Sequence, residues 1–395
     1  MKIERSKKSI YKYIILLVIL GLGYLIFIFA HNIYLIKFIK LSRSIGDSGS
    51  IISSWNGNSS ITLLVTYDAN LNGYYVNTYN ALLSVNPSTK NIYLLAIPNS
   101  LNIYSSVSSL QKIDTIYPLN NLNYPQNGLD VLDKDLNYNF AIPLNSYISF
   151  NSNSINNLFI SKLDINSQVN FSFSKSLNIN KGENNLSLSD MKQILSYSTD
   201  NTNSLYIKNL IFQGILSQIL NPVNLFNPKM KYYNLSKVFY SNLGSGNLFK
   251  LISDIYNIGV SQIQFIDISS AISNNTLSLS SLDTILRQNY INSSFESSNV
   301  SVQILDSSNN NNVTYQLSRY IENLGGTISS IGTYPSTLYK STIYVSNYGQ
   351  YKYEVQMIKS ILGSGNVNIV YRNPVFFYTG SIIVVLGTAG SNIIP

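Results

Sequence analysis

The sequence predicts a mixed α/β (α+β) protein in three parts: an N-terminal transmembrane helix, a larger mixed domain, and a small C-terminal domain of order βαββαβ. Three observations predict this. A long apolar run follows a basic N-terminus. Short apolar runs bounded by Asn, Pro and Ser alternate with helical spacing from residue 61 onward. The same alternation begins again at residue 300, and a chain of 395 residues has room for both domains.

The N-terminal part is expected to be a membrane anchor. Residues 13–36 contain no Asp, Glu, Lys or Arg, and this length suffices to cross a hydrocarbon core of about 30 Å. The tail 1–12 carries five basic residues and one Glu, so the positive-inside rule places the tail in the cytoplasm and the bulk of the chain outside the cell membrane. A cleaved signal peptide is the alternative, but no small-x-small site follows the run. Residues 37–60 predict a linker.

The composition excludes several classes of site. The chain has no Cys and a single His, His31, which adjoins the apolar run. Disulfides, thiolate metal sites and His-based catalysis are therefore excluded from the extracytoplasmic part. Only 11% of the residues are charged, and the net charge of +8 includes the basic tail. Because no other basic cluster exists, nucleic acid is not an expected partner.

Residues 61–270 predict one mixed domain. Residues 61–68 form an apolar run that ends in Asp68, and residues 81–85 and 92–97 predict two further strands around a turn. Residues 188–197 and 205–220 have apolar residues at helical spacing, and Pro222 ends the second helix. The segments between these predict a strand over 136–150, a helix over 154–163 and a strand over 169–173.

Short motifs stand at the ends of the first three strands: Asp68, Val-Asn-Thr at 76–78, and Pro-Asn-Ser at 98–100. Their order resembles the LytR-CpsA-Psr (LCP) domain of bacterial envelope proteins. In that family the first strand ends in Asp, the second follows Arg-Ser-Asp, and the third ends in Pro-Arg-Asp. Further positions that match the family pattern lie in the middle of the domain: Tyr147, Leu163-Asp164, Val169, Lys181-Gly182-Glu183, Leu186 and Tyr197.

The resemblance implies an α/β/α domain that transfers a glycopolymer from a polyprenyl pyrophosphate lipid to peptidoglycan. Family members neutralise the pyrophosphate with arginines and a carboxylate-held Mg²⁺. Here the family's arginine pairs fall near Thr199 and Asn201, and near Asn209 and Phe212; no arginine occurs anywhere between residues 43 and 287. Since neither Asn nor Phe offers the charge or the fork of arginine, catalysis is expected to be reduced or lost.

Three residues stay as candidate catalytic residues: Asp68 and Gln213, which the family pattern retains, and Lys208, which lies near the missing arginines. Asp68 is either a possible Mg²⁺ ligand, with the hydroxyl of Thr78 beside it, or a strand-end residue that caps a turn. Lys208 either replaces a lost arginine or is a solvated helix lysine. Gln213 is expected to be a hydrogen-bonded residue at the edge of the core. No other cofactor is expected.

Residues 300–390 predict the small C-terminal domain, which follows a Ser/Asn-rich connector over 271–299. The order of its strands and helices, with Leu-Gly at 386–387, resembles the C-terminal domain of LytR-type proteins. Its carboxylates, Asp306, Glu322 and Glu354, are too far apart in the sequence for a paired acid/base site. We expect a non-catalytic domain that contacts cell-wall polymer or a protein partner.

These observations support three hypotheses on function. The first is a membrane-anchored envelope protein of LCP type, acting in wall assembly or glycopolymer attachment, with little or no catalysis. The second is an active Mg²⁺-dependent phosphotransferase in which Asp68 holds the metal and Lys208 or Lys181 supplies charge. The third is a non-catalytic module that binds a polyprenyl lipid, peptidoglycan or a wall glycopolymer in an apolar groove.

Overall fold

The computed structural model describes most of the chain after residue 58. No helix within the described residues has the length and apolar character needed to cross a membrane. The basic tail 1–12, much of the predicted anchor 13–36 and nearly all of the linker 37–60 lie outside the described residues, so the anchor stays a prediction. The described residues are 15–30 without 16, 19 and 29, then 59–71, 74–106, 110–116, 128–144, 146–157, 162–198, 200–221, 240–243, 245–290, 293–308 and 310–389.

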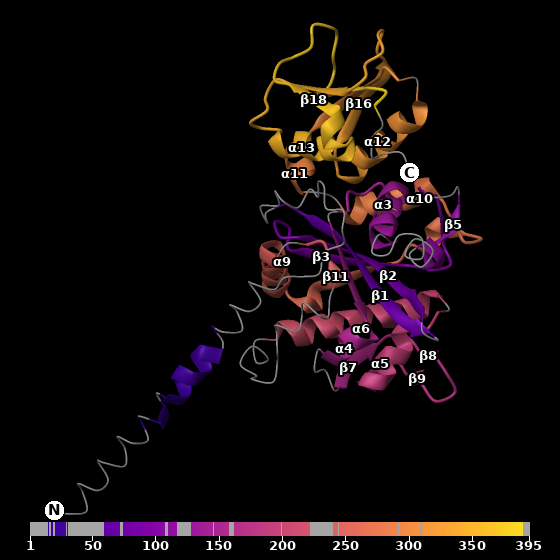
Figure 1. Cartoon of the computed structure of the whole chain (residues 1–395), viewed down its shortest axis with the longest axis vertical. Helices are drawn as coiled ribbons and strands as arrows, with labels where there is room; N and C mark the ends of the chain where they lie inside the picture. Colours follow the sequence, from indigo (N-terminus) through magenta and orange to yellow (C-terminus); the bar gives the residue numbers. More distant parts are fainter. Residues whose placement is uncertain are drawn as a thin grey trace, which may run out of the picture.

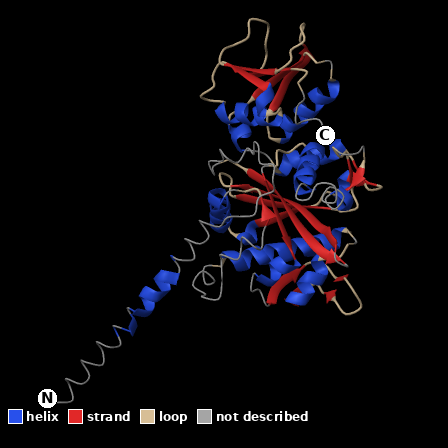
Figure 2. Ribbon diagram, in the orientation of Figure 1, coloured by secondary structure: helices blue, strands red, loops and turns tan. Residues whose placement is uncertain are grey.

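A six-stranded mixed sheet forms the centre of the first unit (Figures 1 and 2). Strands β1, β2 and β3 are antiparallel neighbours. On one side β6 pairs in parallel with β1, and on the other β12 pairs in parallel with β3. Strand β11 pairs antiparallel with β6 at the edge of the sheet. The three strands predicted between residues 61 and 97 are confirmed. The six strands, in spatial order, are β11 (Tyr240–Ser241), β6 (Ser146–Asn151), β1 (Ile61–Leu71), β2 (Tyr74–Asn86), β3 (Asn91–Ile97) and β12 (Ile263–Ile266).

Both faces of this sheet are buried, which explains the nearly continuous apolar runs of its strands. Leu63, Val65 and Tyr67 of β1 face one core, whereas Leu64 between them belongs to the other. Helices cover both faces, so the unit has the expected α/β/α layers (Figure 1). One layer contains α5 (Leu188–Leu195), α6 (Thr202–Leu220) and α9 (Ser245–Ile258); the other contains α3 (Gly128–Phe140) and α10 (Leu279–Asn289).

Helices α5 and α6 begin at capping boxes. The Ser187 hydroxyl accepts from the Asp190 backbone N–H, and Asn201 and Ser204 form the same reciprocal pair at the start of α6. The predicted ends of both helices lie within three residues of the observed ends. The short elements around them are α4 (Ser152–Asn157), β7 (Lys162–Ser167), β8 (Phe171–Ser172), β9 (Asn178–Ile179), β10 (Gly182–Ser187) and η3 (Val260–Gln262).

Three predicted segments differ from the structure. The helix predicted over residues 154–163 is the shorter α4, and residues 162–163 belong to strand β7. Residues 136–140, predicted as the start of a strand, are the last turn of α3, and the strand there is β6 alone. Residues 271–299, predicted as a connector, contain α10, and its Leu282 and Leu286 are fully buried in the core of the first unit. These leucines lie on one helix face, so burial outweighs the polar composition around them. The other elements of this region are β4 (Asn102–Ile103), β5 (Gln111–Lys112), η4 (Ser269–Ala271), β13 (Ile272–Ser273), β14 (Thr276–Leu277) and α11 (Ser293–Ser297).

The C-terminal unit is a five-stranded sheet with helices on one face (Figure 2). The predicted order βαββαβ is correct except that a fourth strand, β18, follows the second helix. Gly387 closes the last strand, where a Cβ would lie 2.5 Å from the Lys340 carbonyl carbon. The elements are β15 (Ser301–Asp306), α12 (Asn311–Asn323), β16 (Thr327–Thr333), β17 (Ser341–Val345), α13 (Lys352–Ile361), η5 (Ser364–Asn366), β18 (Val367–Val370) and β19 (Ile382–Leu386).

Helix α12 of the C-terminal unit caps the C-terminus of α3. The last carbonyls of a helix have no partner within it. Here each of them accepts a hydrogen bond from one face of α12. The donors and acceptors are Tyr320 Oη to Asn137 O (2.8 Å), Gln316 Nε2 to Tyr138 O, Arg319 Nη2 to Asn139 O (3.1 Å), and Asn323 Nδ2 to Phe140 O (3.3 Å) and Ala141 O (3.4 Å).

Arg319 also makes a buried ion pair with Asp283 of α10. Its Nε and Nη2 each lie 2.8 Å from a carboxylate oxygen, and the two side chains are 2% and 7% exposed. Asn323 donates to the same carboxylate at 3.0 Å. The two units therefore share a contact with a buried ion pair and several hydrogen bonds between α3, α10 and α12.

We expect the Arg319→Met variant to lose about 3–5 kcal/mol of unfolding free energy, because the Asp283 carboxylate is left buried without its cation. The matched control is Arg287→Met. Arg287 pairs with Glu322 at 2.7 Å with its side chain 44% exposed, and such a pair contributes about 0–1 kcal/mol. Urea unfolding of the full chain in detergent, followed by circular dichroism, measures both. Equal losses in the two variants would show that the buried pair does not hold the units together.

Candidate functional site

A buried polar cluster lies where β1, β2 and β3 reach one edge of the central sheet. Asp68 of β1 is the register partner of Asn77 of β2, next to a bulge at Thr78 of β2. Asn80 Nδ2 donates to Asn99 Oδ1 at 2.7 Å, which joins β2 to the end of β3. All four side chains are at most 5% exposed. Asp68, Asn77 and Asn99, which stand at positions of the family's charged motifs by the sequence resemblance, thus lie in one cluster.

Lys208 enters this cluster from α6 and is fully buried. Its Nζ donates to the Thr78 carbonyl and to the Tyr197 carbonyl, each at 2.7 Å, and lies 3.5 Å from Asp200 Oδ1. These three acceptors match the three N–H bonds of an ammonium group. The prediction of a solvated helix lysine is therefore wrong. Lys208 is thus a cation next to Asn209, near which the sequence resemblance places a family arginine. Its ammonium group, however, binds backbone carbonyls of this chain.

Asp200 was not found by the sequence analysis, although it immediately precedes the N-cap of α6. Its side chain is fully buried, it accepts from the backbone N–H of Asn99, and it pairs with Lys208. Burial raises the pKa of the Asp200 carboxyl, against the lowering effect of Lys208. Burial likewise lowers the pKa of Lys208 to about 8, against the raising effect of Asp200. The sequence places Asp200 eight residues before Lys208, and this spacing was the one indication of a pair. The two side chains meet because the turn before α6 brings them together.

Two further side chains of the cluster, Tyr79 and Thr78, are neutral and hydrogen-bonded. Tyr79 Oη donates to Asn209 Oδ1 at 2.8 Å, and the hydroxyl of Thr78 donates to the Leu195 carbonyl at 2.8 Å. Burial raises the pKa of Tyr79 well above its ordinary value, so the phenol stays protonated. The Thr78 proton is thus directed to the backbone of α5 rather than toward Asp68.

Asp68 is the candidate metal ligand. It is 4% exposed and accepts from the Ser149 hydroxyl of β6 at 3.0 Å. Among the described residues, no three acidic or histidine side chains gather in a metal-binding group. The cross-strand partner Asn77 is buried, and its side-chain amide has no hydrogen-bond partner in the described part of the chain. One carboxylate and one amide oxygen are suitable in type for Mg²⁺, but only for an ion that takes its other ligands from water or substrate.

Gln213 is not brought into the cluster. Its Nε2 donates to the Val260 carbonyl of η3 at 2.8 Å, which fixes the short helix against α6. It lies five residues beyond Lys208, about 7.5 Å further along the helix axis. Its contact agrees with the expected residue at the edge of the core.

A pocket of about 460 Å³ with both polar and apolar walls borders the cluster. Asp200 and Asn209 line it from the cluster side, and Ser100 lines it from the end of β3. Tyr206 and Phe265, whose rings meet edge to face at 5.6 Å between centroids, form part of its apolar wall. The pocket thus gives a polar ligand access to the edge of the cluster.

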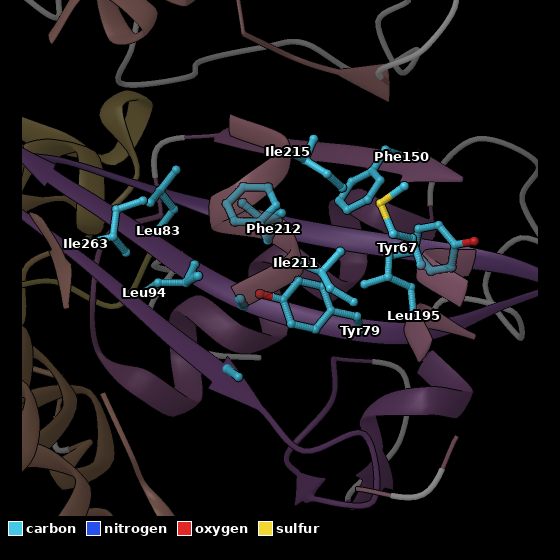
Figure 3. Packing of buried hydrophobic residues seen from close by; sticks show 14 of the residues in the cluster. Tyr67, Tyr79, Leu83, Leu94, Phe150, Leu195, Ile211, Phe212, Ile215 and Ile263 are labelled. Carbon is cyan, nitrogen blue, oxygen red and sulfur yellow. The ribbon is translucent and has the colours of Figure 1, made fainter. Parts of the chain in front are cut away.

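A second, apolar pocket of about 70 Å³ lies between the sheet, α6 and α9. Phe150 of β6 and Phe212 of α6 stack in its wall with centroids 6.1 Å apart, and Ile215 lies beside them (Figure 3). All of its lining residues are Leu, Ile or Phe: Leu83, Ile148, Phe150, Phe212, Ile215, Leu216, Ile219, Leu220, Leu248, Leu251, Ile252 and Ile255. Phe212 lies near a position where the sequence resemblance places a family arginine, and here it extends the apolar surface.

Comparison with known proteins gives matches in structure only. No protein-family model and no curated protein sequence matches the chain. Among similar solved structures, TagV of Bacillus subtilis is 14% identical over 58% of this chain and 94% of its own (TM-score 0.43). TagT bound to LI-WTA is 13% identical over 62% of this chain and 96% of its own (TM-score 0.45). Lin1025 of Listeria innocua is 12% identical over 59% of this chain and 98% of its own (TM-score 0.43). TagV and TagT are LCP-family proteins, and the likeness is one of fold alone.

We expect Lys208→Met to lower the unfolding free energy by about 3–5 kcal/mol, because it leaves the Asp200 carboxylate and two carbonyls buried without their donor. Lys181→Met is the matched control, since Lys181 is exposed and such substitutions change stability by about 0.5 kcal/mol or less. Urea titration at neutral pH compares them. A Lys208→Met variant as stable as the control would contradict the buried position of the ammonium.

Lys208 also predicts a pH dependence of stability. Its pKa in the folded protein, about 8, lies below the value of about 10.4 in an unfolded chain. Between these values the unfolded chain binds more protons, so the unfolding free energy should rise with pH. The 31 tyrosines, whose ordinary pKa is about 10, also begin to titrate there. Burial raises the pKa of Tyr79, Tyr290 and Tyr320, which acts in the opposite direction but equally in both chains. Urea titrations at about pH 7 and 9.5 should therefore show a more positive change of unfolding free energy in the natural chain than in Lys208→Met; equal changes would contradict the role of Lys208.

Proposed function

We propose that this chain is a membrane-anchored extracytoplasmic envelope protein of LCP type that takes part in attaching a glycopolymer to the cell wall, with catalysis reduced or lost. One observation carries the proposal. The side chains at the positions of the family's catalytic charges are brought together, yet they are neutral or, like Lys208, already bound by partners within the fold.

The chemistry explains why this arrangement disfavours catalysis. Breaking the bond to a pyrophosphate leaving group builds up negative charge, which positioned cations must neutralise. The Lys208 ammonium would have to give up two carbonyls and Asp200 to reach such a group. Asn99 and Asn209 offer dipoles but no charge, so transition-state stabilisation is weak.

Binding of a polyprenyl lipid is compatible with the same structure, because an apolar pocket needs no charge. The apolar pocket between the sheet, α6 and α9 supports this part of the proposal. At about 70 Å³ it is smaller than a polyprenyl chain, so binding requires α9 to move away from the sheet. The headgroup and glycopolymer would then extend toward the polar cluster.

The membrane location rests on the sequence of residues 13–36 and the basic tail before it. A single anchor with the N-terminus in the cytoplasm puts both folded units outside the cell membrane. There they have access to lipid-linked glycopolymers and to peptidoglycan.

The test uses the full chain, purified in detergent, with a radiolabelled polyprenyl-pyrophosphate glycopolymer, peptidoglycan and Mg²⁺. We expect saturable binding of the labelled lipid but no transfer of label to peptidoglycan, and Ile215→Asp in the apolar pocket should abolish binding. Ser217→Asp, on the same helix and outside the pocket lining, is the control. Robust transfer that Asp68→Asn abolishes would overturn the loss of catalysis.

That outcome would favour the second candidate, an active Mg²⁺-dependent phosphotransferase. The buried, unpaired amide of Asn77 opposite Asp68 is the observation in its favour, because a metal ion would satisfy its oxygen. In that case Asn77→Leu, which keeps the side-chain size, should reduce transfer by about tenfold or more. Under the first proposal Asn77→Leu changes only stability.

A further inference from the structure

A separate pocket lies at the junction of the two units, where α10 and α12 pack side by side (Figure 1). Its volume is about 640 Å³, and its walls come from α10, α12 and β16. None of its lining residues belongs to the polar cluster or to the apolar pocket. Its size falls within the range of about 300–1,000 Å³ that is usual for small-ligand sites, and such sites often form between domains.

The charges around this junction pocket are paired. Arg319 and Asp283 form its buried floor pair, with 2.8 Å between Nε and Oδ2, and Arg287 and Glu322 pair at 2.7 Å at its partly exposed rim. Two positive and two negative side chains leave the lining without net charge. An anionic ligand therefore gains no unpaired cation here, and a cationic ligand no unpaired carboxylate.

Hydroxyl groups provide hydrogen-bonding capacity between these pairs. Thr314 is 6% exposed, lines the pocket, and its hydroxyl has no hydrogen-bond partner in the described part of the chain. Ser280 and Thr284 of α10 line the opposite wall. A buried hydroxyl without a partner is unfavourable, so a rotation of the Thr314 side chain that brings its hydroxyl to the pocket surface and onto a ligand group would be stabilised.

Apolar surface is also available in the same pocket. Tyr315 is 54% exposed and Ile331 is 56% exposed, and both line it. A ring face beside hydroxyls and paired charges is a surface that suits one ligand chemistry: a molecule with C–H faces and many hydroxyl groups. A lipid would leave the hydroxyls and charges unsatisfied, whereas a sugar satisfies both kinds of surface.

We propose that the junction pocket binds a neutral oligosaccharide, with a sugar ring on Tyr315 and a sugar hydroxyl on the Thr314 hydroxyl. Paired Arg and Glu side chains at the rim can donate to and accept from neighbouring sugar hydroxyls without losing their own pairing. This site is independent of the proposed function, since none of its residues contacts the polar cluster or the apolar pocket described above.

The probe is a β-1,4-linked N-acetylglucosamine tetramer, titrated by calorimetry into the full chain in a detergent without a sugar headgroup. We expect saturable binding that Tyr315→Ala and Thr314→Val each weaken by about tenfold, the value of one lost ring contact or hydrogen bond. Thr314→Val should leave thermal stability unchanged or raised, because it removes an unpaired buried hydroxyl. Tyr339→Ala, at a tyrosine 73% exposed elsewhere in the unit, is the control and should bind as the natural chain does.

Inorganic phosphate and a carboxylated oligosaccharide of the same length are the competing probes. Under the proposal, phosphate does not displace the tetramer and the carboxylated oligosaccharide binds no better. The proposal is overturned if the tetramer shows no saturable binding, if neither variant weakens it, or if phosphate competes for the site. If the tetramer does not bind, the lipid-binding test of the proposed function is unaffected, because that test measures binding of the labelled lipid in the apolar pocket.

Discussion

The hydrogen bonds from α12 to the last carbonyls of α3 hold the two units in one arrangement. Four donors from one face of α12 meet consecutive carbonyls, and the Arg319–Asp283 pair adds a third helix, α10, to the contact. Such contacts are directional, so a small shift between the units breaks several of them together. From α3 the contact continues into the first unit. The Asn139 side chain accepts from the Tyr104 backbone N–H and donates to the Tyr104 carbonyl, next to β4.

The sequence predicts those elements whose periodicity agrees with their burial. The strands from residue 61 to 97 and helices α5 and α6 follow this rule, because each has an apolar face or run long enough to recognise. Helix α3 was missed because Tyr138 and Phe140 alternate with Asn, a pattern that also suits a strand. Helix α10 was missed because its Ser-rich composition outweighed Leu282 and Leu286, four residues apart.

The candidate site, too, was predicted from the sequence only in part. The motifs at the ends of the first three strands drew attention to Asp68, Asn77, Thr78 and Asn99, and the structure places these residues in one cluster. What the sequence left open was where each polar atom is directed. The direction of Lys208 depends on two carbonyls 130 and 11 residues away along the chain, and on Asp200 in the turn before its helix. Such partners are set by tertiary packing and have no local pattern.

The enclosure of Lys208 with Asp200 has a consequence for how ligands reach the site. A cluster whose cation is already paired inside the fold projects little electric field into the pocket that borders it. An anionic glycolipid would then gain no local attraction from the cluster itself. Under the proposed membrane-anchored function, encounter at this site would depend on confinement of both molecules to the same membrane surface, where they diffuse in two dimensions.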